Sequence, residues 1–246
     1  MKIATWNVNG IRARQDQVRA WLQTTAPDVA CLQETKAGRD QVPPDLLHLD
    51  DYWGYWHGFK GYSGVALLVR KSFYAESPLF QHPSFDMENR IVTAAVNGVT
   101  VVSVYVPNGG RDLGVKLRFL EELQDFSRGL RKAGLIVCGD LNVAHTPKDV
   151  HPKERREVVG QLPMERQLLD EILANGLVDL GRKAAPHDDT MYTWWAPWRE
   201  MKQRNIGWRL DYLYASENLA ERMTACVVQK DVGTSDHAPV MATLSF

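Results

Sequence analysis

The sequence predicts an α/β protein in which two mixed β-sheets pack together and helices cover their outer faces. Three observations lead to this fold class. Short apolar runs that end in polar residues recur along the chain, as buried strands do. The dipeptide Asn97-Gly98 joins two β-rich runs and predicts an antiparallel hairpin. Amphipathic helical segments alternate with these runs, which indicates that each sheet has a covered outer face.

The apolar runs are the predicted strands, and most of them are rich in Val, Ile and Leu. They cover residues 3–6, 28–33, 64–70, 91–96, 99–106, 135–138, 210–215 and 239–244. These apolar runs, each followed by polar residues, are distributed along the whole chain. We find no internal repeat, linker or low-complexity stretch between them.

Helical spacing of apolar residues marks three further segments. They cover residues 14–25, 113–132 and 163–175. We expect Gly134 to end the second helix as a left-handed cap, and Gly176 to close the third. A polar loop, residues 144–162, precedes the third helix.

Length and composition describe one ordinary globular domain. The 246 residues suit a single domain over residues 1–246, and the formal net charge of −1 excludes binding of a polyanion through bulk charge. Cys31, Cys138 and Cys226 have no metal-ligand spacing and are expected to be free thiols in a reducing compartment. The sequence has no apolar signal region and no long membrane span, so we expect a cytoplasmic protein that does not bind membranes.

Polar residues collect at the ends of four predicted strands. These clusters are Asn7 with Asn9, Glu34, Asp140 with Asn142, and Asp236 with His237. A carboxylate at the end of a buried strand is costly unless it is paired, hydrogen-bonded or bound to a metal. Taken singly, each is as easily a helix cap or a turn residue. Taken together, they indicate one site whose oxygen ligands suit magnesium or manganese better than zinc.

Seven ordered motifs make the chain resemble the exonuclease III family of apurinic-site endonucleases, within the endonuclease/exonuclease/phosphatase superfamily. The resemblance covers nearly the whole chain. Its motifs are TWNVNGIR (5–12), LQETK (32–36), GYSGV (61–65), VYVPNG (104–109), GDLNVAH (139–145), GWRLDY (207–212) and SDHAP (235–239). The resemblance implies a four-layered α/β sandwich with the site at one end.

The resemblance also implies an activity. It is metal-dependent hydrolysis of the phosphodiester 5′ to abasic sites in duplex DNA, as part of DNA repair. Digestion by a 3′-5′ exonuclease and cleaning of blocked 3′ ends are further activities that the family implies. The expected cofactor is Mg²⁺ with Mn²⁺ as a substitute, and the expected partner of a monomeric enzyme is double-stranded DNA with abasic sites or blocked 3′ ends.

The metal-site residues implied by the resemblance lie in three of the strand-end clusters. Glu34 would be the main ligand, and Asn7 and Asp236 would bind directly or through water, with Asn9 nearby. Magnesium usually keeps several waters and takes one or two carboxylates together with substrate phosphate.

Catalytic roles are implied in the same way. Asp140, with Asn142 beside it, would position and deprotonate the attacking water, and His237, oriented by Asp211, would stabilise the phosphate. Tyr105 and Asn108 would hydrogen-bond phosphate oxygens. Judged from the residues alone, a lone histidine or a strand tyrosine is as readily part of the core. How base and acid duties divide between Asp140, His237 and Tyr105 stays open.

Two further groups would contact DNA. The groups are Lys36, Tyr62, Arg90 and Arg111, which match positions that approach the DNA backbone, and Trp194, Trp208 and Leu210, which match an apolar pocket for the flipped-out abasic sugar. An aromatic pocket of this kind excludes intact nucleotides by size. Taken singly, each charged residue is more simply a solvated side chain.

One departure and three rival functions remain. Where the family has an asparagine after its Asn-Val-Ala-His stretch, this chain has Asp149-Val150-His151-Pro152 and a shortened segment, so substrate preference stays open.

The rival functions are a family member acting mainly at 3′ ends, a phosphoesterase of the superfamily with a non-DNA substrate, and a DNA-damage adaptor without catalysis. The motif GWRLDY argues against the second, and the complete carboxylate set argues against the third.

Overall fold

The computed structural model describes residues 1–130 and 134–245. Its helices are α1 (Gln15–Thr25), α2 (Pro44–Leu47), α3 (Leu113–Leu130), α4 (Pro163–Ala174), α5 (Leu180–Ala184) and α6 (Glu217–Ala220). The last two positions of the predicted helix 113–132 lie outside the described residues. None of the helices in the described ranges is both long and apolar enough to cross a membrane.

The strands form two six-stranded mixed sheets. They are β1 (Lys2–Asn7), β2 (Val29–Gln33), β3 (Tyr52–Phe59), β4 (Tyr62–Arg70), β5 (Phe80–Gln81), β6 (Ile91–Val96), β7 (Val99–Tyr105), β8 (Gly134–Asp140), β9 (Leu177–Asp179), β10 (Asp211–Ser216), β11 (Met223–Val228) and β12 (Val240–Leu244). The first sheet has the order β11-β12-β1-β2-β4-β3 and the second β5-β6-β7-β8-β10-β9.

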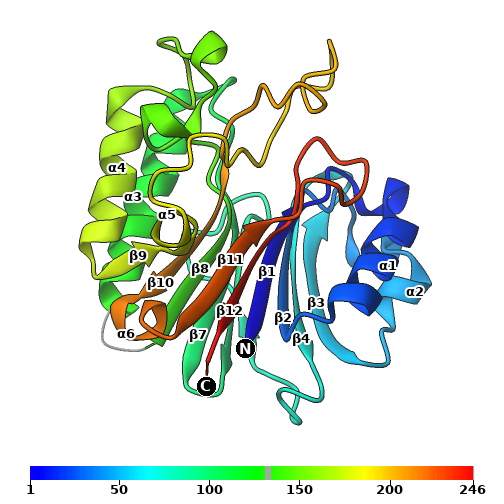
Figure 1. Ribbon diagram of the computed structural model, residues 1–246. Helices are drawn as coiled ribbons and strands as arrows, with labels where there is room; N and C mark the ends of the chain where they lie inside the picture. Colours follow the sequence, from blue (N-terminus) through cyan, green and yellow to red (C-terminus); the bar gives the residue numbers. More distant parts are fainter. Residues whose placement is uncertain (131–133, 246) are drawn as a thin grey trace.

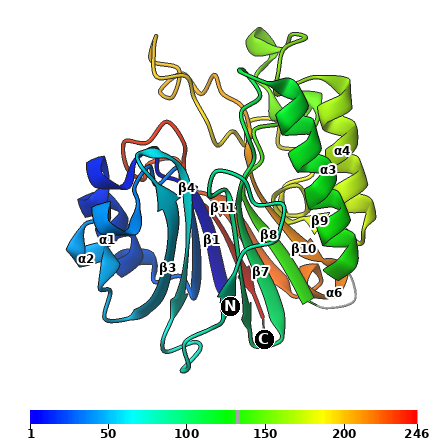
Figure 2. The same ribbon diagram turned by 180° about the vertical axis from the view of Figure 1, so that it is seen from behind.

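Four layers result, as the sequence predicts. The two sheets pack face to face over a core that takes apolar side chains from both, among them Ile3 and Val29 from the first sheet and Val101 and Ile136 from the second. Figures 1 and 2 show α1 and α2 on the outer face of the first sheet and α3 and α4 on the outer face of the second. The predicted α/β sandwich is therefore confirmed.

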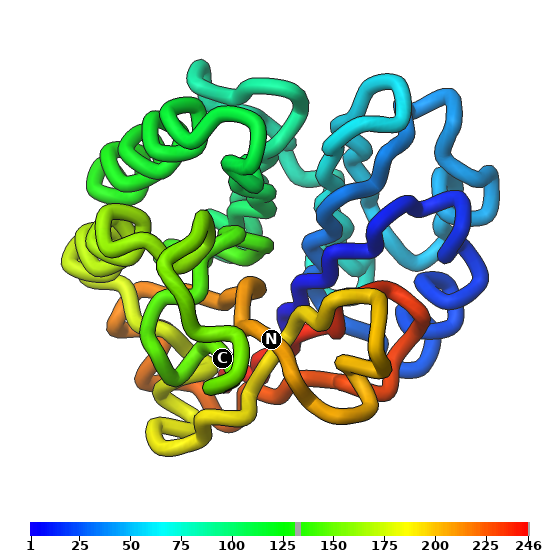
Figure 3. Tube along the Cα trace, turned by 90° about the horizontal axis from the view of Figure 1, so that it is seen from above, coloured from blue at the N-terminus to red at the C-terminus, as the bar shows by residue number. Residues whose placement is uncertain are grey.

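Strand direction brings the polar strand ends to one end of the sandwich. Strand β1 runs parallel to β2, and β7 runs parallel to β8. In the second sheet, Tyr105 is paired with Asp140, and Asp140 with Asp211, so three of the predicted catalytic residues stand in a row across three strands. Figure 3 looks down on this end, where loops from the green, orange and red parts of the chain meet.

The prediction for Gly134 was wrong. Gly134 opens β8 opposite Val99 and belongs to the sheet, because the strand extends one residue beyond its apolar run. Gly176, by contrast, follows α4 with a φ of 85°, as a helix-closing glycine should. The three cysteines are free thiols, as expected.

A buried ion network holds the predicted loop 144–162 to the second sheet. The Asp149 carboxylate accepts from the Arg209 Nε at 2.7 Å and from the Arg182 Nη2 at 2.6 Å. Arg209 also binds Asp179 at 2.7 Å. Burial opposes ionisation of Asp149, but the two guanidinium groups lower its pKa from 3.8 to about 2. The segment that lacks the family's asparagine is thus anchored by charge.

We expect Asp149→Asn to lower the free energy of unfolding at pH 7 by roughly 2–5 kcal/mol, because it removes the carboxylate that pairs with Arg182 and leaves the buried Arg209 with Asp179 as its remaining partner. Since the folded pKa lies below the ordinary one, the stabilisation is present above about pH 4 and is lost as the pH falls towards 2. Urea denaturation at several pH values measures this. The control, Asp45→Asn, breaks the exposed pair with Arg19 and should change little. Parallel wild-type and Asp149→Asn curves down to pH 2 would contradict the assignment.

Candidate active site

One amide joins the ends of three strands. The Asn7 Nδ2 atom donates to the Glu34 Oε1 atom and to the Asp140 Oδ2 atom, both at 2.9 Å. Its oxygen accepts the Asn9 backbone N–H. Asn7 is fully buried, so these contacts fix the ends of β1, β2 and β8 relative to one another across both sheets.

A second set of contacts links Asn9, Lys36 and Asp236. The Asn9 Nδ2 atom donates to the Asp236 Oδ1 atom at 2.8 Å. The Lys36 Nζ atom lies 2.7 Å from the Glu34 Oε2 atom and donates to the Asn9 Oδ1 atom. Lys36 therefore neutralises part of the Glu34 charge inside the site, although we expected it to approach the DNA backbone.

The backbone of this site is strained at several positions. Four of its non-glycine residues have left-handed φ angles, namely Asn9 at 45°, Glu34 at 50°, Lys36 at 49° and Asn142 at 52°. Such conformations cost free energy and persist only where the surroundings determine them, most often at functional sites.

His237 is held between two carboxylates. Its Nδ1 atom lies 2.8 Å from the Asp211 Oδ2 atom, and its Nε2 atom lies 3.8 Å from the Asp140 Oδ2 atom. Thr193, which the sequence did not mark, donates its hydroxyl to Asp211 and accepts the backbone N–H groups of Leu210 and Asp211. Thr193 therefore orients the carboxylate that orients the histidine.

Burial and charge shift the pKa values of the site. Burial raises the pKa of Asp140 to about 7, with Asp211 and Glu34 adding to the rise and His237 opposing it. Burial opposes the charge of His237, but Asp211 and Asp140 raise its pKa to about 10. Burial, followed by Glu34 and Asp140, raises the pKa of Tyr105 far above its ordinary value. His237 is thus a cationic donor and Tyr105 a neutral one.

A cavity of about 320 Å³ lies beside Glu34, Tyr105 and His237. Its lining residues are Glu34, Tyr105, Asn108, Asn142, Val159, Gly160, Trp194, Trp208, Leu210, Asp236 and His237. The rings of Trp194 and Trp208 meet edge to face at 5.7 Å, and both pack on Leu210. The cavity therefore combines an apolar, aromatic part with carboxylates and a histidine, and the two parts touch where the Trp194 Nε1 atom donates to the Asp236 Oδ2 atom at 3.0 Å.

Val159 and Gly160 line the cavity but were not predicted. Gly160 has a φ of 90°, and a Cβ atom there would lie 3.0 Å from the Trp208 ring and 3.3 Å from the Asn142 carbonyl oxygen. A side chain would press on the aromatic wall, so glycine is required. A lone Gly in a polar loop carries no sequence signal for this role.

The remaining predicted DNA contacts form a cluster beside Tyr105. The Arg90 guanidinium lies over the Tyr105 ring at 4.8 Å and donates to the Tyr62 hydroxyl at 3.1 Å. Arg111 lies over the other tyrosine ring, that of Tyr62, at 5.9 Å. Arg90 is buried, so it is no ordinary solvated arginine. The cluster brings two arginine side chains beside the site, although the Glu88 carboxylate, 2.7 Å from the Arg90 Nη2 atom, offsets part of their charge.

The donor set fits a divalent cation. Oxygen atoms of Glu34 and Asp140 and a ring nitrogen of His237 lie within 4.8 Å of one another. Two more carboxylates, Asp211 and Asp236, lie in the same cluster. So much negative charge near the end of a buried sheet, offered mostly by oxygen, is what a hard cation requires.

Comparison with known proteins identifies the family. Residues 4–237 match the Endonuclease/Exonuclease/phosphatase family. The chain is 37% identical to an exodeoxyribonuclease of Bacillus subtilis over 98% of both proteins, and 34% identical to the DNA repair nuclease APEX1 of Danio rerio over 100% of the chain and 82% of that protein. An AP endonuclease from Archaeoglobus fulgidus superposes with a TM-score of 0.91 at 31% identity over the full length of both chains. The chain therefore belongs to the endonuclease/exonuclease/phosphatase family.

Proposed function

We propose that this protein is a metal-dependent DNA repair nuclease that hydrolyses the phosphodiester on the 5′ side of an abasic site in duplex DNA. The observation that carries the proposal is the cavity of about 320 Å³, in which the aromatic rings of Trp194 and Trp208 share one lining with His237. Cavities of this size lie at the small end of ligand sites. A deoxyribose without a base is small enough to enter and is cheaply extruded from the helix.

Mg²⁺ is the proposed cofactor, with Mn²⁺ as a substitute. Glu34 would hold it, with Asp236 and Asn7 binding directly or through water and Asn9 nearby. Asn7 is hydrogen-bonded to Glu34, and Asp236 lines the same cavity as Glu34. When bound, the ion would stabilise negative charge on the phosphate and on the leaving 3′ oxygen. The Lys36 ammonium group, which is paired with Glu34, offsets part of the negative charge of this ligand.

Asp140 is the proposed base. The Asn142 backbone N–H donates to its Oδ1 atom at 2.9 Å, which fixes the carboxylate, and its pKa of about 7 suits proton transfer near neutral pH. His237, cationic because of Asp211, donates a hydrogen bond to the phosphate as charge accumulates on it. Tyr105 and Asn108, which line the same cavity, donate to other phosphate oxygens.

Duplex binding is assigned to the charged cluster beside the cavity. Tyr62, Arg90 and Arg111 are contiguous and would meet the DNA backbone next to the lesion, together with Lys36 beside Glu34. Backbone contacts of this kind position the enzyme without reading the base sequence. We further propose that the protein acts as a monomer in the cytoplasm.

A second candidate is digestion of 3′ ends as the main activity. The relative that is 37% identical is named an exodeoxyribonuclease. The loop that carries Val159 and Gly160 lacks the asparagine of the family pattern, because its sequence reads Asp149-Val150-His151-Pro152. Both activities use the same phosphate site. They differ in whether the cavity must accept a baseless sugar or an intact terminal nucleotide.

Replacing Trp208 with serine distinguishes the two. The change enlarges the cavity and removes its aromatic wall, so discrimination against intact nucleotides should fall. We expect exonuclease digestion to rise relative to abasic-site incision, by roughly tenfold for a lost apolar contact of 1–3 kcal/mol. The measurement is the ratio of the two rates on matched duplexes.

The matched control is Trp53→Ser, which removes a half-buried tryptophan of β3 at the opposite end of the first sheet. Its ratio should equal that of the wild type. An unchanged ratio in folded Trp208→Ser protein would mean that the lesion is selected elsewhere.

A further inference from the structure

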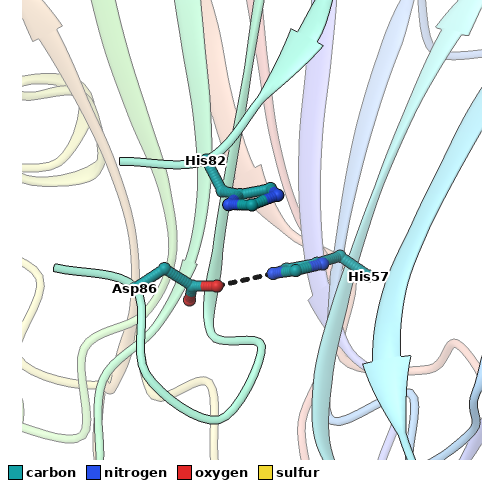
Figure 4. Close-up of side chains that lie close together, drawn as sticks. All are labelled: His57, His82 and Asp86. Carbon is teal, nitrogen blue, oxygen red and sulfur yellow. Dashed lines mark hydrogen bonds and ion pairs between the residues drawn. The ribbon is translucent and has the colours of Figure 1, made fainter. Parts of the chain in front are cut away.

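A second cluster of metal-ligand side chains lies at the edge of the sandwich, outside the active site. His57 belongs to β3, the edge strand of the first sheet, whereas His82 and Asp86 follow β5, the edge strand of the second. Figure 4 shows the two segments facing each other, with His57 directed at Asp86 and the His82 ring beside it. The His57 Nε2 atom lies 2.6 Å from the Asp86 Oδ2 atom.

We propose that His57, His82 and Asp86 bind one transition-metal ion of the zinc class and thereby join the edges of the two sheets. Each residue offers one ligand atom, and the three atoms lie within 4.8 Å of one another. Two imidazoles and one carboxylate form a common three-ligand set for zinc, whose fourth position a water molecule fills. This donor set is softer than the oxygen-rich one at Glu34.

The Asp86 carboxylate is already oriented for such a role. Its Oδ1 atom accepts the backbone N–H groups of Arg90 at 2.8 Å and Ile91 at 3.1 Å. These bonds leave the Oδ2 atom directed at His57. Hydrogen bonds that hold a ligand from behind are the usual support of a metal-binding carboxylate.

Metal binding requires two small adjustments. The rings of His57 and His82 are stacked at 4.6 Å with 12° between their planes, so a single ion cannot lie in both planes until one ring turns. His82 is exposed and makes no hydrogen bond within the described part of the chain, so it can turn. The ion would replace the proton between His57 and Asp86 and widen their 2.6 Å contact to roughly 3.3 Å, the spacing of neighbouring ligands around zinc.

A second His–Asp pair in the structure lacks the third ligand that the edge cluster has. The His145 Nε2 atom lies 2.7 Å from the Asp170 Oδ1 atom, almost the same distance. Among the described residues, that pair belongs to no group of three possible ligands. The distinguishing feature of the edge cluster is therefore the second imidazole of His82, and His145 serves as a matched control.

An ion bound to this cluster would also affect the segment that carries Arg90. Asp86 is hydrogen-bonded to the backbone of Arg90, whose side chain lies on Tyr105 and Tyr62. An ion that ties Asp86 to β3 would hold the segment that carries Arg90 against the first sheet. Zinc bound there would stabilise the folded protein and restrict the arginine.

The test is a titration of the metal-free full chain with Zn²⁺. Calorimetry measures the affinity, and the melting temperature (Tm) measures the stabilisation. Because the active site also offers ligands, the titration is made in a Glu34→Gln background, with His82→Asn and His145→Asn added separately. We expect Zn²⁺ to bind Glu34→Gln protein and raise its Tm. Adding His82→Asn should weaken binding at least about tenfold, and adding His145→Asn should leave it unchanged.

His82 is exposed, so its loss should not impair folding, and the Tm without zinc verifies this. Equal Zn²⁺ affinity with and without His82, equal losses in the two histidine variants, or no binding by Glu34→Gln protein would each overturn the proposal. These outcomes are distinct from those of the nuclease tests, because they measure Zn²⁺ affinity and Tm, and none of the three ligands lines the active-site cavity.

Discussion

Asp140→Asn should lower the turnover of abasic-site incision by about 10²- to 10⁴-fold, the contribution of a positioned general base. The substitution keeps the shape of the side chain and removes the carboxylate that we propose accepts the proton from water. Duplex affinity should change little, because Asp140 lies at the buried end of β8 and contacts Asn7, Asn142 and His237. Single-turnover incision of a duplex with one abasic analogue, alongside a binding isotherm, measures both quantities.

Stability separates this result from misfolding. Burial raises the pKa of Asp140 above its ordinary value, so the folded state disfavours the ionised form at neutral pH, and a neutral amide should not lower the melting temperature. Asp45→Asn, at an exposed position on α2, is the control and should retain full turnover. Wild-type turnover in folded Asp140→Asn protein would exclude Asp140 as the base.

His237→Asn should lower turnover by about 10²- to 10³-fold, as expected for one preorganised donor that meets charge in the transition state. The Asp211 carboxylate keeps the imidazole cationic and fixes its orientation. Asparagine retains a donor but loses the charge. Because the charge on the phosphate grows only during reaction, the loss should fall on turnover far more than on duplex affinity.

The exposed histidine variant His187→Asn is the control for this measurement and should behave as wild type. If His237→Asn weakened duplex binding and left turnover unchanged, the histidine would serve docking instead.

The sequence was informative where polar residues interrupt buried strands. Asn7, Glu34 and Asp140 stand at strand ends, and a charge in such a place needs a partner, so their convergence could be expected. The row of Tyr105, Asp140 and Asp211 across three strands could not, since it depends on the order and register of β7, β8 and β10.

The sequence did not reveal residues whose role is to position another side chain of the site. Thr193 and Gly160 matter because of the carboxylate and the ring that they happen to meet after folding. The four edge strands β3, β5, β9 and β11 also went unpredicted. Strands β3 and β11 are partly exposed and lack a continuous apolar run, and β5 and β9 are only two and three residues long. Gly134 was assigned to a helix end because glycine there usually caps, but sheet pairing with Val99 determined its conformation.

The most direct test of the proposed function is the position and metal dependence of the cut. A duplex with one abasic analogue is labelled on the damaged strand and incubated with Mg²⁺, with Mn²⁺ and with excess chelator, using wild-type and Glu34→Gln protein. We predict one incision immediately 5′ to the lesion, leaving a 3′ hydroxyl, that is lost in chelator, restored by either metal and strongly weakened in Glu34→Gln. Efficient incision in chelator, cleavage 3′ to the lesion, or digestion from the 3′ end with no internal cut would contradict the account.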